Sequence, residues 1–314
     1  MKPRLNTSSV LSRATRYFKA FRCVLKHPSL LARHEHIFLL THMRGYTTLL
    51  SHILGSHPEV SGYTEAWFGR GRAPYRNSIN LLQLRCVVSY HGNYKPKARY
   101  VLDKLLHNGI EISDSVLTRD DVRCLFMIRK PEPTIKSIVD LHRRYTKQAT
   151  TNNETTPPGT AEVLLPRAEV EGADPWGEIT MPRTIEAAAG YYRARVEWLA
   201  DMGEHLHALG KPGLAIVGED LIDHPVQLLG DIQRFLELTT PLEDRYSTFE
   251  RTGTWFRGDT SEFISRGNIE RNRPEHSDIT IPPEISTEVN RAYAKCLARL
   301  EQCIPFAGRP TSGT

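Results

Sequence analysis

A short stretch near the beginning of the chain carries residue types suited to holding an anion. The apolar run at 37–40 predicts a buried strand, and a polar turn, THMRGY at 41–46, follows it. Thr47 and Thr48 then open a segment with the apolar spacing of an amphipathic helix. The first N–H groups of a helix lack intrahelical partners and carry partial positive charge. Hydroxyls and an arginine add donors for phosphate oxygens, so the stretch predicts a phosphate-binding turn.

The turn is not that of the nucleoside triphosphatases, because no G-x-x-x-x-G-K-[ST] sequence is present. It resembles the sulfotransferases that use 3′-phosphoadenosine 5′-phosphosulfate (PAPS), especially the tyrosylprotein sulfotransferases and their bacterial relatives. The resemblance rests on Arg44, on His57-Pro58-Glu59-Val60 after the helix, and on Glu65 in a Gly-x-x-Glu-like strand end. It implies that the 5′-phosphosulfate is cradled by the turn and helix start, namely Arg44, Gly45, Tyr46, Thr47 and Thr48.

One departure from the family concerns the two residues after the basic one. The family usually has Ser-Gly there, whereas this chain has Gly45-Tyr46. A tyrosine where glycine is usual crowds the loop unless its backbone stays at negative φ. The sequence therefore predicts the location of the loop and leaves its geometry open.

A second motif follows the apolar segment 122–128, which predicts another strand. Arg129 stands where that strand stops, and Ser137 falls about two turns into a helix opened by Lys130-Pro131. In the resembling family an arginine and a serine eight residues later bind the 3′-phosphate of the cofactor, and here 137 − 129 = 8. Arg266 and Gly267 resemble more loosely the basic segment that closes over that phosphate, with a generic basic loop as the alternative.

The general base has two candidates. Glu65 lies 65 − 44 = 21 residues after Arg44, similar to the spacing in the tyrosylprotein-type enzymes, at a strand end where open α/β sheets bind ligands. His107 is the rival, because cytosolic sulfotransferases carry a Lys-x-His pattern and this chain has the longer Lys104-Leu-Leu-His107. In this interpretation Lys104 contacts the sulfuryl oxygens. The alternatives are a surface glutamate paired with a nearby arginine, a turn histidine and a solvated lysine.

Apolar runs that alternate with helical patterns predict the elements that position these residues. Further strands are expected at 99–107 and 214–217, and helices at 78–90, 111–119, 131–147, 184–209, 225–238 and 283–302. This alternation predicts an α/β domain with a parallel sheet flanked by helices, and the resemblance implies a P-loop-like sulfotransferase fold. The expected divisions are a basic helical arm at 1–33, a domain at 34–306 with an inserted loop at about 150–183, and a tail at 307–314.

The composition is that of an ordinary globular chain, with 314 residues, 39% hydrophobic and 25% charged. The net charge of +5 favours an anionic ligand or a membrane surface without indicating nucleic acid. The five cysteines are scattered and form no C-x-x-C pair, which favours a reducing compartment. No apolar run approaches the roughly 18 residues of a membrane span and no signal-peptide core is present, so we expect a cytoplasmic protein.

The arm carries a helically spaced set of basic residues among aromatic and aliphatic ones. These are Arg13, Arg16, Lys19, Arg22 and Lys26. Such a segment either lies on an anionic membrane or packs on the domain and keeps its charges in water.

Together these features predict an enzyme that moves the sulfuryl group of PAPS in line to an acceptor hydroxyl and releases adenosine 3′,5′-bisphosphate. No metal is required, because positioning, a cation at the leaving phosphate and a carboxylate base suffice. We expect a carbohydrate or lipid-linked acceptor rather than a peptide, since a chain without export signals meets cytoplasmic precursors. The alternatives are a non-catalytic nucleotide-binding protein, favoured by Gly45-Tyr46, and a phosphate-loop kinase, disfavoured by the missing Walker lysine and magnesium carboxylate.

Overall fold

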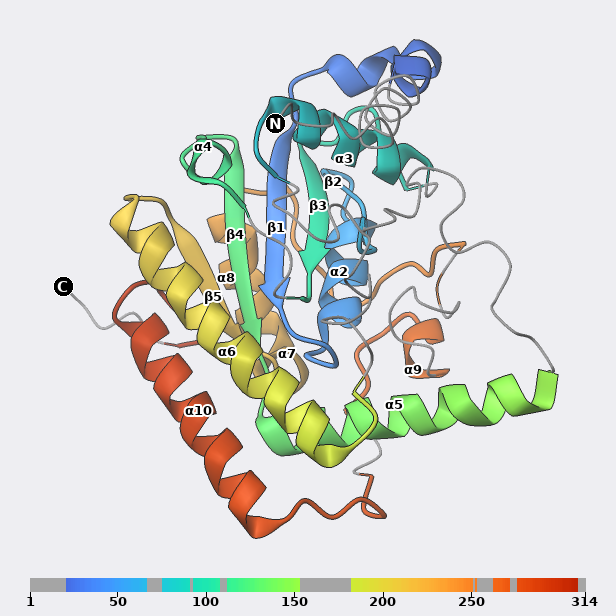
Figure 1. Ribbon diagram of the computed structural model, residues 1–314. Helices are drawn as coiled ribbons and strands as arrows, with labels where there is room; N and C mark the ends of the chain where they lie inside the picture. Colours follow the sequence, from blue (N-terminus) through green and yellow to red (C-terminus); the bar gives the residue numbers. More distant parts are fainter. Residues whose placement is uncertain are drawn as a thin grey trace, which may run out of the picture.

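The protein is built around one parallel sheet. The computed structural model describes residues 21–66, 75–90, 93–107, 112–152, 182–250, 252, 262–271 and 276–309. Within them five strands pair in parallel in the order β2-β3-β1-β4-β5, with β1 at the centre (Figure 1). The strands are β1 Glu35–Thr41, β2 Val60–Ser61, β3 Tyr100–Leu105, β4 Val122–Ile128 and β5 Gly213–Val217. The predicted α/β fold with a parallel sheet is confirmed.

Helices cover both faces of this sheet (Figure 1). In the described ranges they are η1 Pro28–Leu31, α2 Thr47–Ser56, α3 Ser78–Tyr90, α4 Asp114–Leu117, α5 Pro131–Asn152, α6 Ile185–Ala208, α7 Asp220–Asp223, α8 Pro225–Phe235, α9 Glu262–Ser265 and α10 Pro283–Glu301. Apolar residues of α2 and α8 form one core with Ile37 and Leu39 of β1. Those of α3, α5, α6 and α10 form the other core with Phe38 and Leu40. The alternation of β1 side chains between the two cores follows from the two-residue period of a strand.

Two described elements lie at the expected domain boundaries. Helix α5 runs to Asn152, so it continues into the stretch from 150 expected to be an inserted loop. A nucleated helix gains one backbone hydrogen bond per added residue, and the weak helix formers Thr150 and Thr151 do not stop it. At the other end, Ala307 N–H donates to Ala215 of β5 at 2.8 Å, so the expected tail at 307–314 begins inside the packed domain. The remainder of the expected loop, 153–181, lies outside the described residues.

The direction of the connections changes beside the central strand. After β1 the chain enters α2 on one face, whereas after the adjacent β4 it enters α5 and then α6 on the other. The crevice at the carboxyl ends of two such strands is where open α/β sheets bind ligands. The turn that contains Arg44 follows β1, and Arg129 follows β4. The topology therefore brings both predicted phosphate motifs to one place.

A buried arginine on α6 ties the strand ends at this crevice. Arg195 is fully buried; its Nε donates to the carbonyl oxygen of Thr41 at 2.6 Å, and its Nη2 donates to that of Leu105. Its guanidinium carbon lies 3.9 Å from the ring centroid of Trp198. Burial lowers the pKa of Arg195 to about 10, so the group stays charged at neutral pH. Arg195 thus clamps the ends of β1 and β3.

Replacing Arg195 by methionine should therefore destabilise the protein. The substitution leaves the two buried carbonyls of Thr41 and Leu105 without this donor, which costs about 3 kcal/mol, measured by urea unfolding. Arg193→Met is the matched control, because Arg193 lies on the same helix and makes an exposed pair with Glu288 at 2.6 Å; such pairs contribute about 0–1 kcal/mol. Equal losses in the two variants would refute the clamp.

Candidate functional site

The turn after β1 has an unusual backbone. Arg44 has φ 59°, Tyr46 has φ 63° and ψ 16°, and Gly45 between them is not among the positive-φ residues. Thr47 then begins α2, so the sign of φ alternates along the turn. Alternation of this kind directs successive N–H groups to one side and forms a concave anion-binding nest. The turn is therefore shaped to receive an anion, next to the unpaired N–H groups at the start of α2.

The negative φ that would relieve crowding at Tyr46 is not adopted. A left-handed conformation costs a non-glycine residue about 1–2 kcal/mol, and it persists where other contacts compensate. The guanidinium carbon of Arg129 packs on the ring of Tyr46, 4.0 Å from the ring centroid. In addition, Arg129 Nη1 donates to the carbonyl oxygen of Arg44 at 2.9 Å. The aromatic ring thus takes part in holding the two motifs together.

The two predicted motifs are in direct contact. Arg44 Nε donates to Ser137 Oγ at 2.8 Å, although the two residues lie 93 positions apart in the sequence. Arg129 lies between them and Glu219, whose carboxylate is 3.9 Å from Arg129 Nε. Burial raises the pKa of Glu219. Two guanidinium groups, one serine hydroxyl and the nest thus form one largely cationic cluster.

His42 joins the backbones of the two motifs. Its Nε2 accepts the N–H of Arg129 at 3.0 Å, and its Nδ1 lies 2.9 Å from the carbonyl oxygen of Met43. The ring must therefore be neutral, with its proton on Nδ1. Burial lowers the pKa of His42 to about 4, which maintains that state. The ring packs edge-on against Tyr192 of α6, whose hydroxyl donates to the carbonyl oxygen of Arg129 at 2.7 Å.

The candidate base His107 lies near Tyr191, a residue that the sequence analysis missed. Its hydroxyl donates to the carbonyl oxygen of Leu106 at 2.7 Å and accepts the N–H of Met43 at 2.8 Å. Burial raises the pKa of Tyr191, and the negative charge of Glu65 acts in the same direction. The ring of His107 is centred 6.2 Å from that of Tyr191. The Tyr191 hydroxyl therefore joins the turn to the segment after β3 that carries His107.

The solvated alternative for Lys104 is wrong, because this side chain is only 2% exposed. Tyr100 and Leu102 of the same strand pack in the core with α2, so by alternation Lys104 faces the α2 side of the sheet. Its neighbour Asp103 faces the opposite side, where it accepts the N–H of Ala66 at 2.8 Å and the hydroxyl of Tyr75. Burial raises the pKa of Asp103 to about 6. Through Ala66 this carboxylate fixes the backbone next to Glu65.

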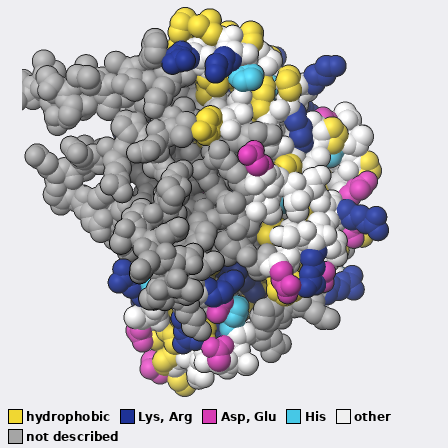
Figure 2. Space-filling view, turned by 90° about the vertical axis from the view of Figure 1, so that its right-hand side faces the viewer, with side chains coloured by type: hydrophobic (Ala, Val, Ile, Leu, Met, Phe, Trp, Pro, Cys, Tyr) yellow, Lys and Arg dark blue, Asp and Glu magenta, His cyan; other side chains and the backbone are white. Residues whose placement is uncertain are grey.

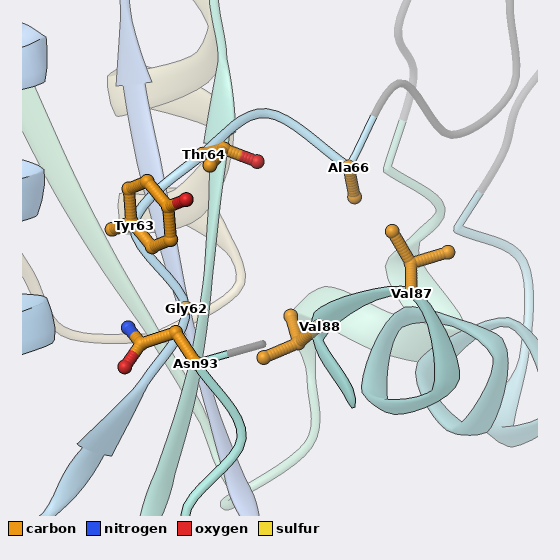
Figure 3. Close-up of a pocket in the computed structure, with 7 residues that line it drawn as sticks. All are labelled: Gly62, Tyr63, Thr64, Ala66, Val87, Val88 and Asn93. Atoms are coloured by element: carbon orange, nitrogen blue, oxygen red, sulfur yellow. The ribbon is translucent and has the colours of Figure 1, made fainter. Parts of the chain in front are cut away.

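A small, mostly apolar cavity adjoins the same segment. It is lined by Gly62, Tyr63, Thr64, Ala66, Val87, Val88 and Asn93 (Figure 3). Ala66 points toward Val87 of α3, and Asn93 lies below Tyr63 (Figure 3). Asn93 is 6% exposed and its Nδ2 has no hydrogen-bond partner within the described chain. Because buried donors are normally satisfied, this amide is suited to a water or an oxygen of a bound group.

Arg266 and Gly267, the more loosely predicted pair, lie in a separate segment after α9. Arg266 pairs with Glu262 and Glu270 at 3.3 Å each, and the carbonyl oxygen of Gly267 accepts the N–H of Tyr246 at 2.8 Å. Their closure over the 3′-phosphate stays a prediction. Further along the chain, His276 lies 3.7 Å from Asp140 of α5. Burial lowers its pKa, and the positive charge of Arg44 also contributes.

No family model matches the chain, and no curated protein is significantly similar to it in sequence. Among the described residues, no group of three or more His, Cys, Asp or Glu side chains is arranged to hold a metal ion. No helix in the described ranges is long and apolar enough to cross a membrane.

The neutral state of His42 predicts that the protein becomes less stable as the pH is lowered. Its pKa is about 4 in the folded protein against 6.5 ordinarily, so the unfolded chain binds more protons between these values. The free energy of unfolding should decrease by about 2 kcal/mol between pH 7 and 4.5 from this group. His36, whose pKa burial lowers to about 3, acts in the same window.

Urea unfolding at the two pH values measures this loss. His42→Asn should reduce it, whereas His207→Asn, on the exposed side of α6, should leave it unchanged. The same pH dependence in His42→Asn as in the natural protein would contradict the assignment.

The conformation of Tyr46 predicts an unusual order of stabilities. Tyr46→Ala keeps the left-handed strain and loses the ring over Arg129, whereas Tyr46→Gly loses the ring and removes the strain. The glycine variant should therefore be more stable than the alanine variant by about 1 kcal/mol, by urea or thermal unfolding. Tyr46→Phe keeps the ring and should stay closest to the natural protein. An alanine variant more stable than the glycine variant would show that φ at this residue is not positive.

Proposed function

We propose that the protein is a PAPS-dependent sulfotransferase. The observation that carries the proposal is the 2.8 Å hydrogen bond from Arg44 Nε to Ser137 Oγ. The resemblance assigns these residues to opposite ends of one nucleotide, Arg44 to the 5′-phosphosulfate and Ser137 to the 3′-phosphate. Their contact, with Arg129 beside them, supports a single site for a doubly phosphorylated nucleotide.

The residues of the cluster fit such a ligand in charge and in donor type. Arg44 and Arg129 supply two fixed charges, while the nest and the start of α2 supply N–H groups for the 5′ end. Arg129 donates to the Arg44 carbonyl and Arg44 to Ser137. These donors would be redirected to phosphate oxygens on binding. When bound, PAPS supplies a sulfuryl group on a bisphosphate leaving group.

Glu65 is the proposed general base. It would take the proton of the acceptor hydroxyl as that oxygen bonds to sulfur and the bond from sulfur to the phosphate oxygen breaks. Lys104, on the α2 face of the sheet, would stabilise the charge that develops on the leaving oxygen. His107 is the alternative base.

A hydroxyl on a carbohydrate or a lipid-linked precursor is the proposed acceptor. A second candidate is a non-catalytic nucleotide-binding protein. One observation favours it, namely that the Tyr46 ring on Arg129 occupies the turn where the resembling family has glycine.

Calorimetric titration with adenosine 3′,5′-bisphosphate in the absence of metal tests the nucleotide site. We expect binding that exceeds that of ATP with magnesium. Arg129→Ala should weaken it roughly 10- to 100-fold, because a charge-assisted contact is lost. Arg123→Ala, at the amino end of the same strand, is the matched control and should bind normally. Preference for ATP with magnesium would refute the proposal in favour of a kinase.

Turnover separates the two candidate functions and the two bases. Release of adenosine 3′,5′-bisphosphate from PAPS is followed with a panel of carbohydrate and polyprenyl-linked acceptors. Glu65→Gln should reduce the rate at least 100-fold, as expected for general-base catalysis, with nearly unchanged bisphosphate affinity. Loss in His107→Gln instead would assign the base to His107. Tight binding without turnover on any acceptor would favour the non-catalytic candidate.

A further inference from the structure

One end of the molecule exposes several large apolar side chains together. The helical residues 21–26, η1 and α3 carry five of the six large hydrophobic residues that are exposed in the described chain. These five, between 45% and 64% exposed, are Phe21, Leu25, Leu31, Ile79 and Tyr90. The sixth is Val226, on α8. We refer to the five as the apolar end surface.

The segment that carries this surface is fixed to the body of the protein. Leu30 is fully buried, and Arg85 Nη1 donates to the carbonyl oxygens of Leu30 and Ala32 at 3.0 Å each. Cys23 Sγ lies 3.9 Å from the carbonyl oxygen of Cys86 on α3. Phe21 and Leu25, one helical turn apart, remain exposed. Their exposure is therefore a feature of a packed element.

The segments that carry the apolar end surface contain basic residues and no acidic ones. Arg22, Lys26 and Arg33 are exposed within the same segment. Residues 21–34 contain no Asp or Glu, and neither does α3. Figure 2 shows hydrophobic and basic side chains together at this end of the molecule. Basic groups beside exposed aromatic and aliphatic side chains are the combination that binds the interface of an anionic lipid bilayer.

We propose that the apolar end surface and its basic residues bind an anionic membrane. Phe21 and Leu25 would enter the headgroup region, while Arg22 and Lys26 contact lipid phosphates. A second copy of the chain fits this surface poorly, because a two-fold contact would place the basic residues against themselves. The proposal does not rest on the sulfotransferase reaction.

The fold sets how the bound protein would be oriented. The segment leads directly into the amino end of β1, whereas the Arg44 turn follows its carboxyl end (Figure 1). The seven residues of β1 separate the two by roughly 20 Å. The candidate site would therefore face water, which favours a carbohydrate over a lipid-linked acceptor in the same membrane.

Sedimentation of the full chain with vesicles tests the proposal. The vesicles are phosphatidylcholine alone, or phosphatidylcholine mixed with phosphatidylglycerol. Phe21→Ser with Leu25→Ser removes the apolar contacts, and Arg22→Glu with Lys26→Glu reverses the charge. Val226→Ser and Arg291→Glu change exposed residues of the same types on α8 and α10. Circular dichroism checks that each variant is folded.

We expect binding to the anionic vesicles at least tenfold above binding to the neutral ones, weakened by salt. Both double variants should lose at least tenfold in binding, because one removes the two inserting apolar side chains and the other reverses two charges that face the anionic lipid. The Val226 and Arg291 variants should bind normally. No preference for anionic vesicles, or equal losses in the control variants, would overturn the proposal. A dimer seen by light scattering and abolished by Phe21→Ser with Leu25→Ser would assign the surface to a second copy instead.

Discussion

The buried guanidinium of Arg195 determines how the candidate site is built. Parallel strands that end side by side present carbonyl oxygens that the sheet no longer satisfies, and such groups are costly when buried. Helix α6 supplies the donors, with Arg195 on Thr41 and Leu105 and Tyr191 on Leu106. One side of one helix thus holds the ends of β1 and β3, after which the turn and His107 follow, whereas Glu65 follows β2.

Because α6 holds the ends of β1 and β3, the turn can keep a backbone conformation that its sequence disfavours. Arg44 and Tyr46 both have positive φ, at about 1–2 kcal/mol each. The contacts of Arg129 with the Tyr46 ring and the Arg44 carbonyl are of the size needed to offset much of this. Because those contacts involve the same groups that would bind phosphate, strain and anion affinity are linked in this site.

The parts of the site that are local in sequence could be predicted, and the parts made by distant contacts could not. Strand β4 and helix α3 have the expected bounds. Arg129 and Ser137 were singled out through the resemblance, by an arginine at a strand end and a serine eight residues later. Tyr191 reaches Met43 across 148 positions and Arg195 reaches Thr41 across 154. From the sequence of α6 alone, these two side chains cannot be distinguished from other residues of an amphipathic helix. The positive φ of Tyr46 could not be predicted either, because the contact with Arg129 that offsets its strain forms only in the folded protein.

The polarity of a parallel sheet also explains why two cationic regions of this chain can act independently. At the carboxyl ends, helix starts and the arginines of the turn concentrate positive charge around a concave site. At the amino ends, Arg22, Lys26 and Arg33 surround exposed apolar side chains. The strand length of roughly 20 Å exceeds the Debye length of about 8 Å at physiological ionic strength. Lipid binding at one end should thus change the nucleotide affinity little, so that each region can be altered by mutation without disturbing the other.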